Sequence, residues 1–269
     1  MKKTVVLGAG GRMGQAISRC LLNGSVDDLE LIGAVDLWDC PSLNTDVGLA
    51  VGGNESEVKI ISDLSVVGPD ADVIIDFTSH FCTAGNAPRC AEWGTAMVVG
   101  TTGLSEEEVV ALEEAAKSIP IVWAPNMSLG VNLLFSLVES AAAALKGKGY
   151  DIEIIERHHR LKKDAPSGTA LGLGKAAAAG YKWDLQKTRK DGRCGDEGER
   201  PEEEIGIHAV RGGGVVGDHT VLFAAEGECV ELSHRAITRD TFALGALRAA
   251  SWIVDSPPGL YSMKDVLGL

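Results

Sequence analysis

The first half of the chain alternates short apolar runs with longer segments of helical spacing. The runs are almost wholly apolar, which is typical of parallel strands buried on both faces. We predict strands at 4–7, 29–35, 59–61, 73–76, 97–99 and 121–123, and helices at 15–22, 83–93 and 105–118. Ser105 and Glu108 form a capping-box signature at the start of the last helix. This alternation predicts βαβ units around one parallel sheet.

The pattern changes after Asn126. A long helix rich in alanine and leucine is predicted at 130–145. A second helix is predicted at 241–254, where a Pro-Pro-Gly segment follows its end. Between them, period-two alternation from Asp151 and at 205–210, 219–224 and 229–235 predicts strands joined by glycine turns. The polar stretch 187–204 is interpreted as a mobile surface loop. We therefore place a domain boundary near Asn126 and expect an α+β second domain.

The turn after the first strand is rich in glycine, reading Gly8-Ala9-Gly10-Gly11-Arg12-Met13-Gly14. Glycines let backbone amides approach a pyrophosphate, and the following helix N-terminus adds partial positive charge. The strict G-x-G-x-x-G spacing fails, because Met13 stands at its third glycine position. Asp36 ends the second strand, where a carboxylate would hold ribose hydroxyls or, alternatively, cap a turn. Together these residues predict a dinucleotide-binding domain.

Two further loops follow strands of the same predicted sheet, Gly100-Thr101-Thr102-Gly103 and Ala124-Pro125-Asn126-Met127. Open α/β sheets bind ligands beyond the carboxyl ends of their strands, so the nicotinamide half of a cofactor fits between these loops. A plain βα turn explains either loop equally well on its own. Leu37 follows Asp36, so Arg12 is the only nearby cation for a 2'-phosphate, and it is equally well explained as a solvated helix-start residue.

The most unusual stretch is basic and lies at 153–170. It concentrates His158, His159, Arg160, Lys162 and Lys163 before the turn Asp164-Ala165-Pro166, in a chain that is otherwise acidic. Ser167 then looks like a helix N-cap, with the amides of Gly168 and Thr169 in the first turn. Isolated histidines are usually structural, but here cations and a helix N-terminus converge. We therefore predict a site for a small polyanion, where a histidine or lysine also donates a proton.

Composition narrows the function classes. The net charge of -13 over 269 residues argues against nucleic acid as a partner. There is no apolar run long enough for a membrane span and no signal-peptide pattern, so the cytoplasm is expected. The six cysteines have neither C-x-x-C nor zinc spacing, so free thiols are expected, with Cys194 exposed and no metal bound.

Motifs along nearly the whole chain carry a family resemblance. They are VVLGAGGRMG, VIIDFT, MVVGTTG, APNMSLGVN, EIIERHHRLKKDAPSGTA, VVGDHT, TFALGALRAA and MKDVL. In these the sequence resembles the 4-hydroxy-tetrahydrodipicolinate (dihydrodipicolinate) reductases. The resemblance implies a Rossmann-type dinucleotide domain at 1–126 and 241–269, and an α+β mixed-sheet domain at 127–240 for substrate binding and tetramerisation. It also implies a cytoplasmic homotetramer.

The resemblance further implies the reaction and the residue roles. The family reduces a cyclic imine dicarboxylate, with loss of water, in diaminopimelate and lysine biosynthesis, using NADH or NADPH. By resemblance His158 is a proton donor or acceptor and Lys162 a proton donor. Substrate contacts are expected at His159, Lys163, Ser167, Gly168 and Thr169. Cofactor contacts are expected at Gly8, Ala9, Gly10, Gly11, Arg12, Met13, Asp36, Gly100, Thr101, Thr102, Ala124, Pro125, Asn126 and Met127.

The sequence departs from the family pattern at one position, and two other functions were considered. Some family members carry an arginine after the acidic ribose ligand, and Leu37 here predicts a preference for NADH. A semialdehyde dehydrogenase needs a cysteine nucleophile, yet none lies between Cys90 and Cys194. A nucleotide sensor without catalysis needs no cationic cluster beside the nicotinamide. Both rivals are therefore disfavoured.

Overall fold

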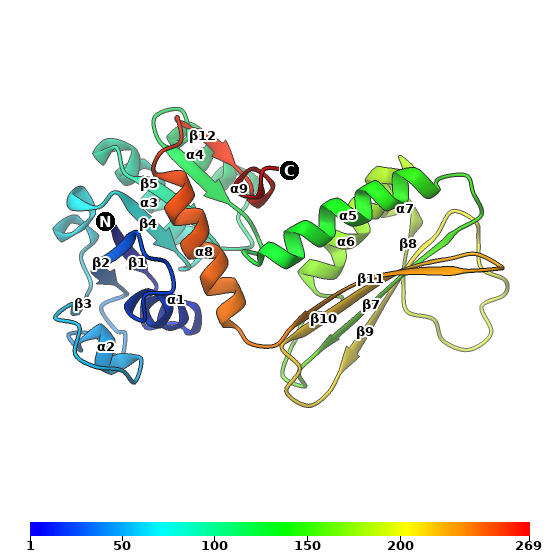
Figure 1. Cartoon of the computed structure of the whole chain (residues 1–269), viewed down its shortest axis with the longest axis horizontal. Helices are drawn as coiled ribbons and strands as arrows, with labels where there is room; N and C mark the ends of the chain where they lie inside the picture. The colour runs from blue at the N-terminus through cyan, green and yellow to red at the C-terminus, as the bar shows by residue number, and fades with distance from the viewer. The chain divides into compact units, whose positions relative to one another are not determined.

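The computed structural model describes all residues, 1–269, and the chain forms two compact units (Figure 1). Unit 1 contains Met1–Leu129 and Arg239–Leu269, and unit 2 contains Gly130–Thr238. The chain leaves unit 1 slightly later than the expected boundary at Asn126, and it re-enters slightly before the expected residue 241.

Unit 1 contains a seven-stranded sheet in the order β12-β6-β5-β4-β1-β2-β3, and every neighbouring pair is parallel. Its strands are β1 (Lys2–Leu7), β2 (Leu29–Val35), β3 (Ile60–Ile61), β4 (Val73–Asp76), β5 (Ala96–Val99), β6 (Pro120–Trp123) and β12 (Gly259–Tyr261). The order reverses at β1, whose neighbours are β4 and β2, and this is the switch point of a Rossmann-type sheet. The predicted α/β architecture is thereby confirmed.

Helices cover both faces of this sheet, because successive strand residues point to opposite sides. On one face α1 (Arg12–Leu22) and α8 (Asp240–Ile253) pack on side chains such as Val6 and Ile75. On the other, α3 (His80–Trp93) and α4 (Glu106–Ala115) pack on neighbours such as Val5 and Ile74. The predicted capping box of α4 is confirmed, since Ser105 and Glu108 exchange hydrogen bonds. Short helices α2 (Val47–Ala50) and α9 (Met263–Leu267) complete the unit.

Unit 2 is a five-stranded mixed sheet in the order β11-β10-β7-β9-β8. Its strands are β7 (Asp151–His158), β8 (Arg189–Asp191), β9 (Ile205–Arg211), β10 (Gly217–Ala224) and β11 (Cys229–Ala236), and its helices are α5 (Leu129–Leu145), α6 (Gly168–Tyr181) and α7 (Leu185–Thr188). Strand β10 is antiparallel to both neighbours, whereas β7, β9 and β8 run parallel. Helices α5 and α6 cover one face (Figure 1), where Ile152, Ile154 and Phe223 are fully buried.

The stretch 187–204 differs from the predicted loop. It contains the end of α7 and strand β8, which pairs with β9, and two arginines join the rest of it to the sheet. Arg193 pairs with Glu153 and Glu204, and Arg200 pairs with Glu153 and Asp151. The polar residues that suggested mobility therefore form ion pairs with β7, which is distant in the sequence. Local sequence does not reveal such pairs.

Two smaller expectations also need correction. The Gly212–Gly214 turn does not join paired strands, because β7 lies between β9 and β10; its backbone instead bonds the chain at His158 and Arg160. Cys229 is exposed as well as Cys194, and all six cysteines are free thiols. None of the helices combines the length and apolar character that crossing a bilayer requires.

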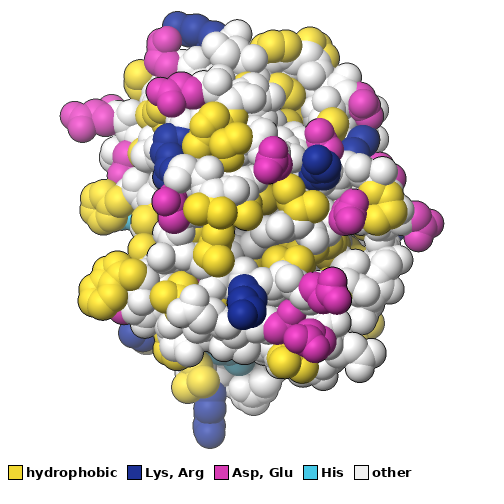
Figure 2. Space-filling view, turned by 90° about the vertical axis from the view of Figure 1, so that its left-hand side faces the viewer, with side chains coloured by type: hydrophobic (Ala, Val, Ile, Leu, Met, Phe, Trp, Pro, Cys, Tyr) yellow, Lys and Arg dark blue, Asp and Glu magenta, His cyan; other side chains and the backbone are white.

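The space-filling view shows one face of the molecule, on which Lys and Arg side chains are scattered singly among acidic and apolar ones (Figure 2). This distribution, together with the net charge of -13, gives that face no continuous basic surface for a phosphate backbone.

Candidate active site and cofactor pocket

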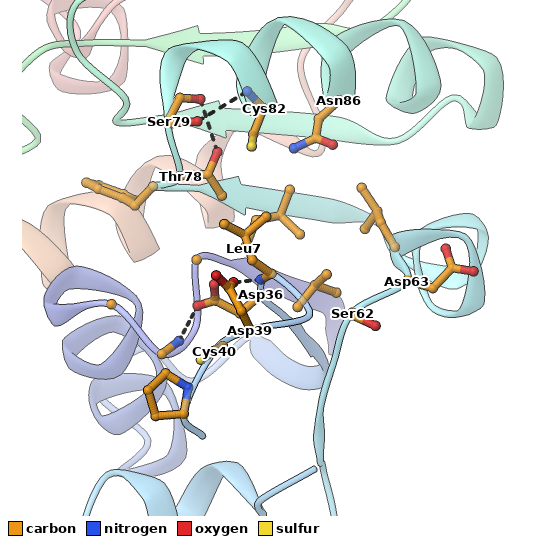
Figure 3. A pocket seen from close by; sticks show the side chains of 18 of the residues that line it. Leu7, Asp36, Asp39, Cys40, Ser62, Asp63, Thr78, Ser79, Cys82 and Asn86 are labelled. Carbon is orange, nitrogen blue, oxygen red and sulfur yellow. Dashed lines mark hydrogen bonds between the residues drawn. The ribbon is translucent and has the colours of Figure 1, made fainter. Parts of the chain in front are cut away.

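A pocket of about 610 Å³ opens in unit 1 where β1, β2 and β4 end (Figure 3). The glycine turn between β1 and α1 forms one wall and Asp36 at the end of β2 forms the next. The start of α3 lies opposite them. The predicted residues Gly8, Gly10, Gly11 and Asp36 are therefore brought together in one cavity.

The glycine turn is held by two close approaches of backbone to backbone. A Cβ on Gly14 would lie 2.1 Å from the Gly8 carbonyl oxygen, which no side chain tolerates. Gly8 itself has φ +73° and lies against the carbonyl of Phe77. Met13 replaces the usual third glycine, and Gly14 meets the requirement for close packing of helix and turn one residue later.

Asp36 faces the glycine turn. Its carboxylate accepts 2.7 Å hydrogen bonds from the backbone N–H groups of Gly10 and Leu37, as Figure 3 shows for the turn. The Leu37 side chain is exposed, and so is Arg12, which does not line the pocket. A cavity of this size with an anion-binding turn and a carboxylate fits the adenosine and phosphate half of a dinucleotide.

Several lining residues escaped the sequence reasoning. Three of them come directly after β4, namely Phe77, Thr78 and Ser79. The VIIDFT motif, which covers residues 73–78, could have pointed to them. Cys40 also lines the cavity and lies beside Gly10. Arg89 on α3 also lines the cavity. Its guanidinium lies 3.8 Å from Asp63 and 5.2 Å from the centroid of the Trp93 ring. The sequence gives no signal that Arg89 lines the cavity, because it is a single arginine within a helix. The order of the strands in the sheet brings α3 beside the end of β3.

The loops after β5 and β6 leave the same edge of the sheet but do not line this cavity. Fully buried Asp76 accepts a 2.6 Å hydrogen bond from the Thr78 hydroxyl and a 3.5 Å bond from that of Thr101. Thr101 is thus anchored inside the unit, while Thr102 beside it is exposed. In the second loop Asn126 accepts from the Ser128 N–H at 2.9 Å. Asp76 therefore ties the Thr78 wall of the pocket to the Thr101 loop.

In unit 2 the basic stretch folds around a fully buried carboxylate, that of Glu156 on β7. Arg211 on β9 donates two hydrogen bonds to it, at 2.7 and 2.8 Å. The Ser167 N–H donates at 2.9 Å, and Nδ1 of His158 lies 2.6 Å away. Burial raises the pKa of Glu156, but these bonds outweigh it and hold the pKa below its usual value. Glu156 is therefore a carboxylate anion.

His158 is buried at the end of β7, and its pKa lies below the usual value. Burial is the main cause; Lys162 and Arg211 lower the pKa further, and Glu156 partly offsets them. Nζ of Lys162 lies 2.9 Å from a carboxylate oxygen of Asp164, and that lysine is only partly exposed. At neutral pH the histidine is thus neutral.

The predicted substrate contacts occupy different environments. Gly168 and Thr169 are the first two residues of α6, and Lys163 is an exposed residue of the turn that precedes this helix. Ser167 is buried, and its hydroxyl caps α6 by accepting from Ala170 and lies 3.1 Å from Nε2 of His219. Through these contacts the Ser167 side chain fixes the first turn of α6.

His219 on β10 is a buried histidine that the sequence reasoning missed. Its ring stands edge-on to that of His158 with 5.1 Å between centroids. Burial is the main cause that lowers the pKa of His219 to about 3, and the neighbouring His158 ring, when it is protonated, lowers it further. The strand itself was predicted at 219–224, and the VVGDHT motif contains His219. The role of His219 was missed because a single alternating histidine is indistinguishable from a core position.

His219 makes unit 2 sensitive to acid. The unfolded chain binds a proton near pH 6.5, whereas folded His219 resists protonation down to about pH 3. Stability is therefore full above pH 6.5 and falls as the pH drops toward 3, by on the order of 2 kcal/mol between pH 7 and 5. His219→Gln should lose that much less over this interval, measured by urea unfolding at both pH values. Parallel curves for variant and parent would contradict the assignment.

Comparison with known proteins matches both halves of the chain. The family described as dihydrodipicolinate reductase, N-terminus, matches residues 2–127, and its C-terminus counterpart matches 130–267. A 4-hydroxy-tetrahydrodipicolinate reductase of Anaeromyxobacter dehalogenans is 48% identical over 100% of this chain and 98% of its own. One of Methanopyrus kandleri is 49% identical over 98% and 95%.

Solved structures agree in fold. A dipicolinate-bound dihydrodipicolinate reductase from Paenisporosarcina sp. TG-14 superposes with a TM-score of 0.76 at 26% identity, covering 97% of both chains. An aspartate semialdehyde dehydrogenase from Vibrio cholerae has a TM-score of 0.56 at 11% identity, covering 94% of this chain and 98% of its own, and shares the fold alone. The relatives confirm an oxidoreductase with a domain for NADH or NADPH. The chain therefore belongs to the dihydrodipicolinate reductase family.

Proposed function

We propose that this protein reduces 4-hydroxy-tetrahydrodipicolinate to tetrahydrodipicolinate in the cytoplasmic synthesis of diaminopimelate and lysine. The names of its full-length relatives support the reaction. The observation that carries it to this chain is the grouping in unit 2 of His158, Lys162 and the N-terminus of α6 around buried Glu156. Six free thiols fit a reducing compartment.

The cationic turn suits a cyclic imine with two carboxylates. We assign the carboxylates to His159, Lys163 and the first turn of α6 at Gly168 and Thr169, because lysine charge and helix N-terminal amides both favour anions. Ser167 keeps that turn in place through its own hydrogen bonds and belongs to the same proposed substrate site. In unit 1 we assign the dinucleotide to residues 8–13, Asp36, and the loops 100–102 and 124–127.

Bound NADH or NADPH supplies the hydride. The substrate loses water and gains the hydride on a ring carbon, and the adjacent carbon then needs one proton to complete the new C–H bond. We assign that proton to the Lys162 ammonium, which is a hydrogen-bond donor, because burial keeps neighbouring His158 neutral. The sum is substrate, NAD(P)H and a proton giving product, NAD(P)+ and water.

The reaction is tested by following NADH oxidation with freshly generated 4-hydroxy-tetrahydrodipicolinate. Consumption of NADH that requires the substrate is the expected result. Binding of NADH without consumption would overturn the proposal and favour a nucleotide sensor. A semialdehyde dehydrogenase remains disfavoured, because no cysteine lies between Cys90 and Cys194 to act as its nucleophile.

The pocket supports a preference for NADH. Asp36 places a carboxylate at the ribose position with exposed Leu37 beside it, and Arg89 across the cavity is near Asp63. A 2'-phosphate there meets negative charge, so kcat/KM for NADH should exceed that for NADPH by about 10-fold or more. Steady-state kinetics with both cofactors measure this. In Asp36→Ala the ratio should shrink, whereas an NADPH advantage in the parent enzyme would contradict the preference.

We also propose a homotetramer built on unit 2. The sheet face opposite α5 and α6 carries Ile155 and Leu222, which are only partly buried, and Val210, which is 49% exposed. Such apolar side chains between ion pairs favour association of copies through this face.

A further inference from the structure

Arg211 contacts both parts of the proton-transfer machinery. Its guanidinium donates two hydrogen bonds to the Glu156 carboxylate and a third, at 2.7 Å, to the backbone carbonyl of Asp164. Glu156 binds His158, and the Asp164 carboxylate binds Lys162. One side chain on β9 therefore connects the residues that hold His158 and Lys162.

The contact with Glu156 determines which ring nitrogen of His158 carries hydrogen. Glu156 is fully buried and ionised beside Arg211, and a carboxylate anion only accepts hydrogen bonds. Nδ1 of His158, 2.6 Å away, must therefore be the N–H donor. In the neutral ring this leaves the lone pair on Nε2, so His158 presents an acceptor at that edge.

The contact with Asp164 fixes the turn that carries Lys162. The turn 159–167 is bonded at both ends, by the Ser167 N–H to Glu156 and by the His159 N–H to the Val215 carbonyl. Between them Arg211 holds the Asp164 carbonyl, and the carboxylate of the same residue holds Nζ of Lys162 at 2.9 Å. The planar guanidinium of Arg211 has several N–H donors and can therefore bond Glu156 and the Asp164 carbonyl at the same time. A lysine ammonium does not reproduce this geometry.

We propose that Arg211 and Glu156 form a positioning pair, which fixes the Nδ1–H tautomer of His158 and the placement of Lys162 for proton transfer. The pair rests on the proposed function, because it acts through His158 and Lys162. The charged or titratable groups facing His158 are Glu156 on its own strand, Lys162 in the turn, Arg211 on β9 and His219 on β10.

The tautomer is tested first on the unaltered protein, by ¹⁵N NMR of the histidine rings, with the His158 signal assigned from its absence in His158→Gln. A protonated Nδ1 and an unprotonated Nε2 are expected at neutral pH. The opposite tautomer would overturn the proposal without any assumption about activity.

Glu156→Gln then changes the acceptor with little change in shape. The amide N–H₂ group offers a donor where His158 needs an acceptor, so the ring should change tautomer or lose its partner. We expect kcat to fall about 10- to 10²-fold, with KM for NADH unchanged. The His158 protonation limb should also move to lower pH, because the carboxylate that raises its pKa is gone. Arg211→Lys should lower kcat too, since one ammonium cannot hold both oxygens and the Asp164 carbonyl.

The matched control is Glu153→Gln, three residues earlier on β7 and on the opposite face of the sheet. Glu153 is also paired with arginines, Arg193 and Arg200, and with a histidine, His208. The kcat of Glu153→Gln should equal that of the parent enzyme. If kcat, pH profile and tautomer of Glu156→Gln all equal those of the parent, the pair does not position His158. If His158→Gln keeps full activity, the role of His158 as proton donor or acceptor, which the family resemblance implies, fails instead.

Discussion

Replacing Lys162 by alanine is expected to lower kcat by about 10²- to 10⁴-fold, the range that general-acid catalysis supplies. The ammonium is held 2.9 Å from Asp164, and neighbouring His158 is neutral at physiological pH, so His158 does not replace the lost proton donor. KM for NADH should stay the same, because the dinucleotide pocket belongs to unit 1. Steady-state kinetics with varied NADH and varied substrate separate the two effects.

Lys163→Ala is the matched control for this variant. Its lysine is adjacent in sequence but exposed, and we assign it to substrate binding alone. It should raise KM for the substrate and leave kcat largely intact. Equal losses of turnover and of NADH affinity in Lys162→Ala would contradict the role of Lys162 as proton donor.

Gly14→Ala should disable the cofactor pocket. The added Cβ would lie 2.1 Å from the Gly8 carbonyl oxygen and 2.7 Å from Cα of Ala9, both in the backbone of the turn. The turn must move away from α1, which costs about 1–3 kcal/mol as an overpacking change. Because small displacements of a binding loop are costly, NADH affinity should fall by about 10²-fold. Thermal unfolding and titration of NADH by fluorescence measure the two losses.

Gly85→Ala provides the comparison within α3 of the same unit. A Cβ at Gly85 meets no atom within 4 Å, so alanine should fit and stabilise the helix by about 0.5–1 kcal/mol. NADH affinity should be that of the parent protein. A Gly14→Ala protein that bound NADH as tightly as Gly85→Ala would show that the turn has more freedom than its backbone contacts indicate.

The strands of unit 1 were predictable because parallel strands buried on both faces must be almost wholly apolar. The predicted bounds of β2 and β4 agree with the observed Leu29–Val35 and Val73–Asp76. The glycine turn was also predictable, since its signal is local: the glycines lie within the seven residues 8–14, and a Cβ on Gly14 would meet the backbone of Gly8 and Ala9 in the same turn. Arg89 was not, because its place in the pocket depends on the sheet order.

The chemical groups are evident in the local sequence: a glycine turn followed by Asp36, and a basic run containing His158 and Lys162. The charge and protonation of those groups depend on the tertiary structure. Arg211 lies far along the chain from Glu156, yet β9 beside β7 joins them. That pairing keeps a buried carboxylate charged, and the charge determines which nitrogen of His158 holds its hydrogen. Burial and strand pairing set such states, and neither is encoded in neighbouring residues.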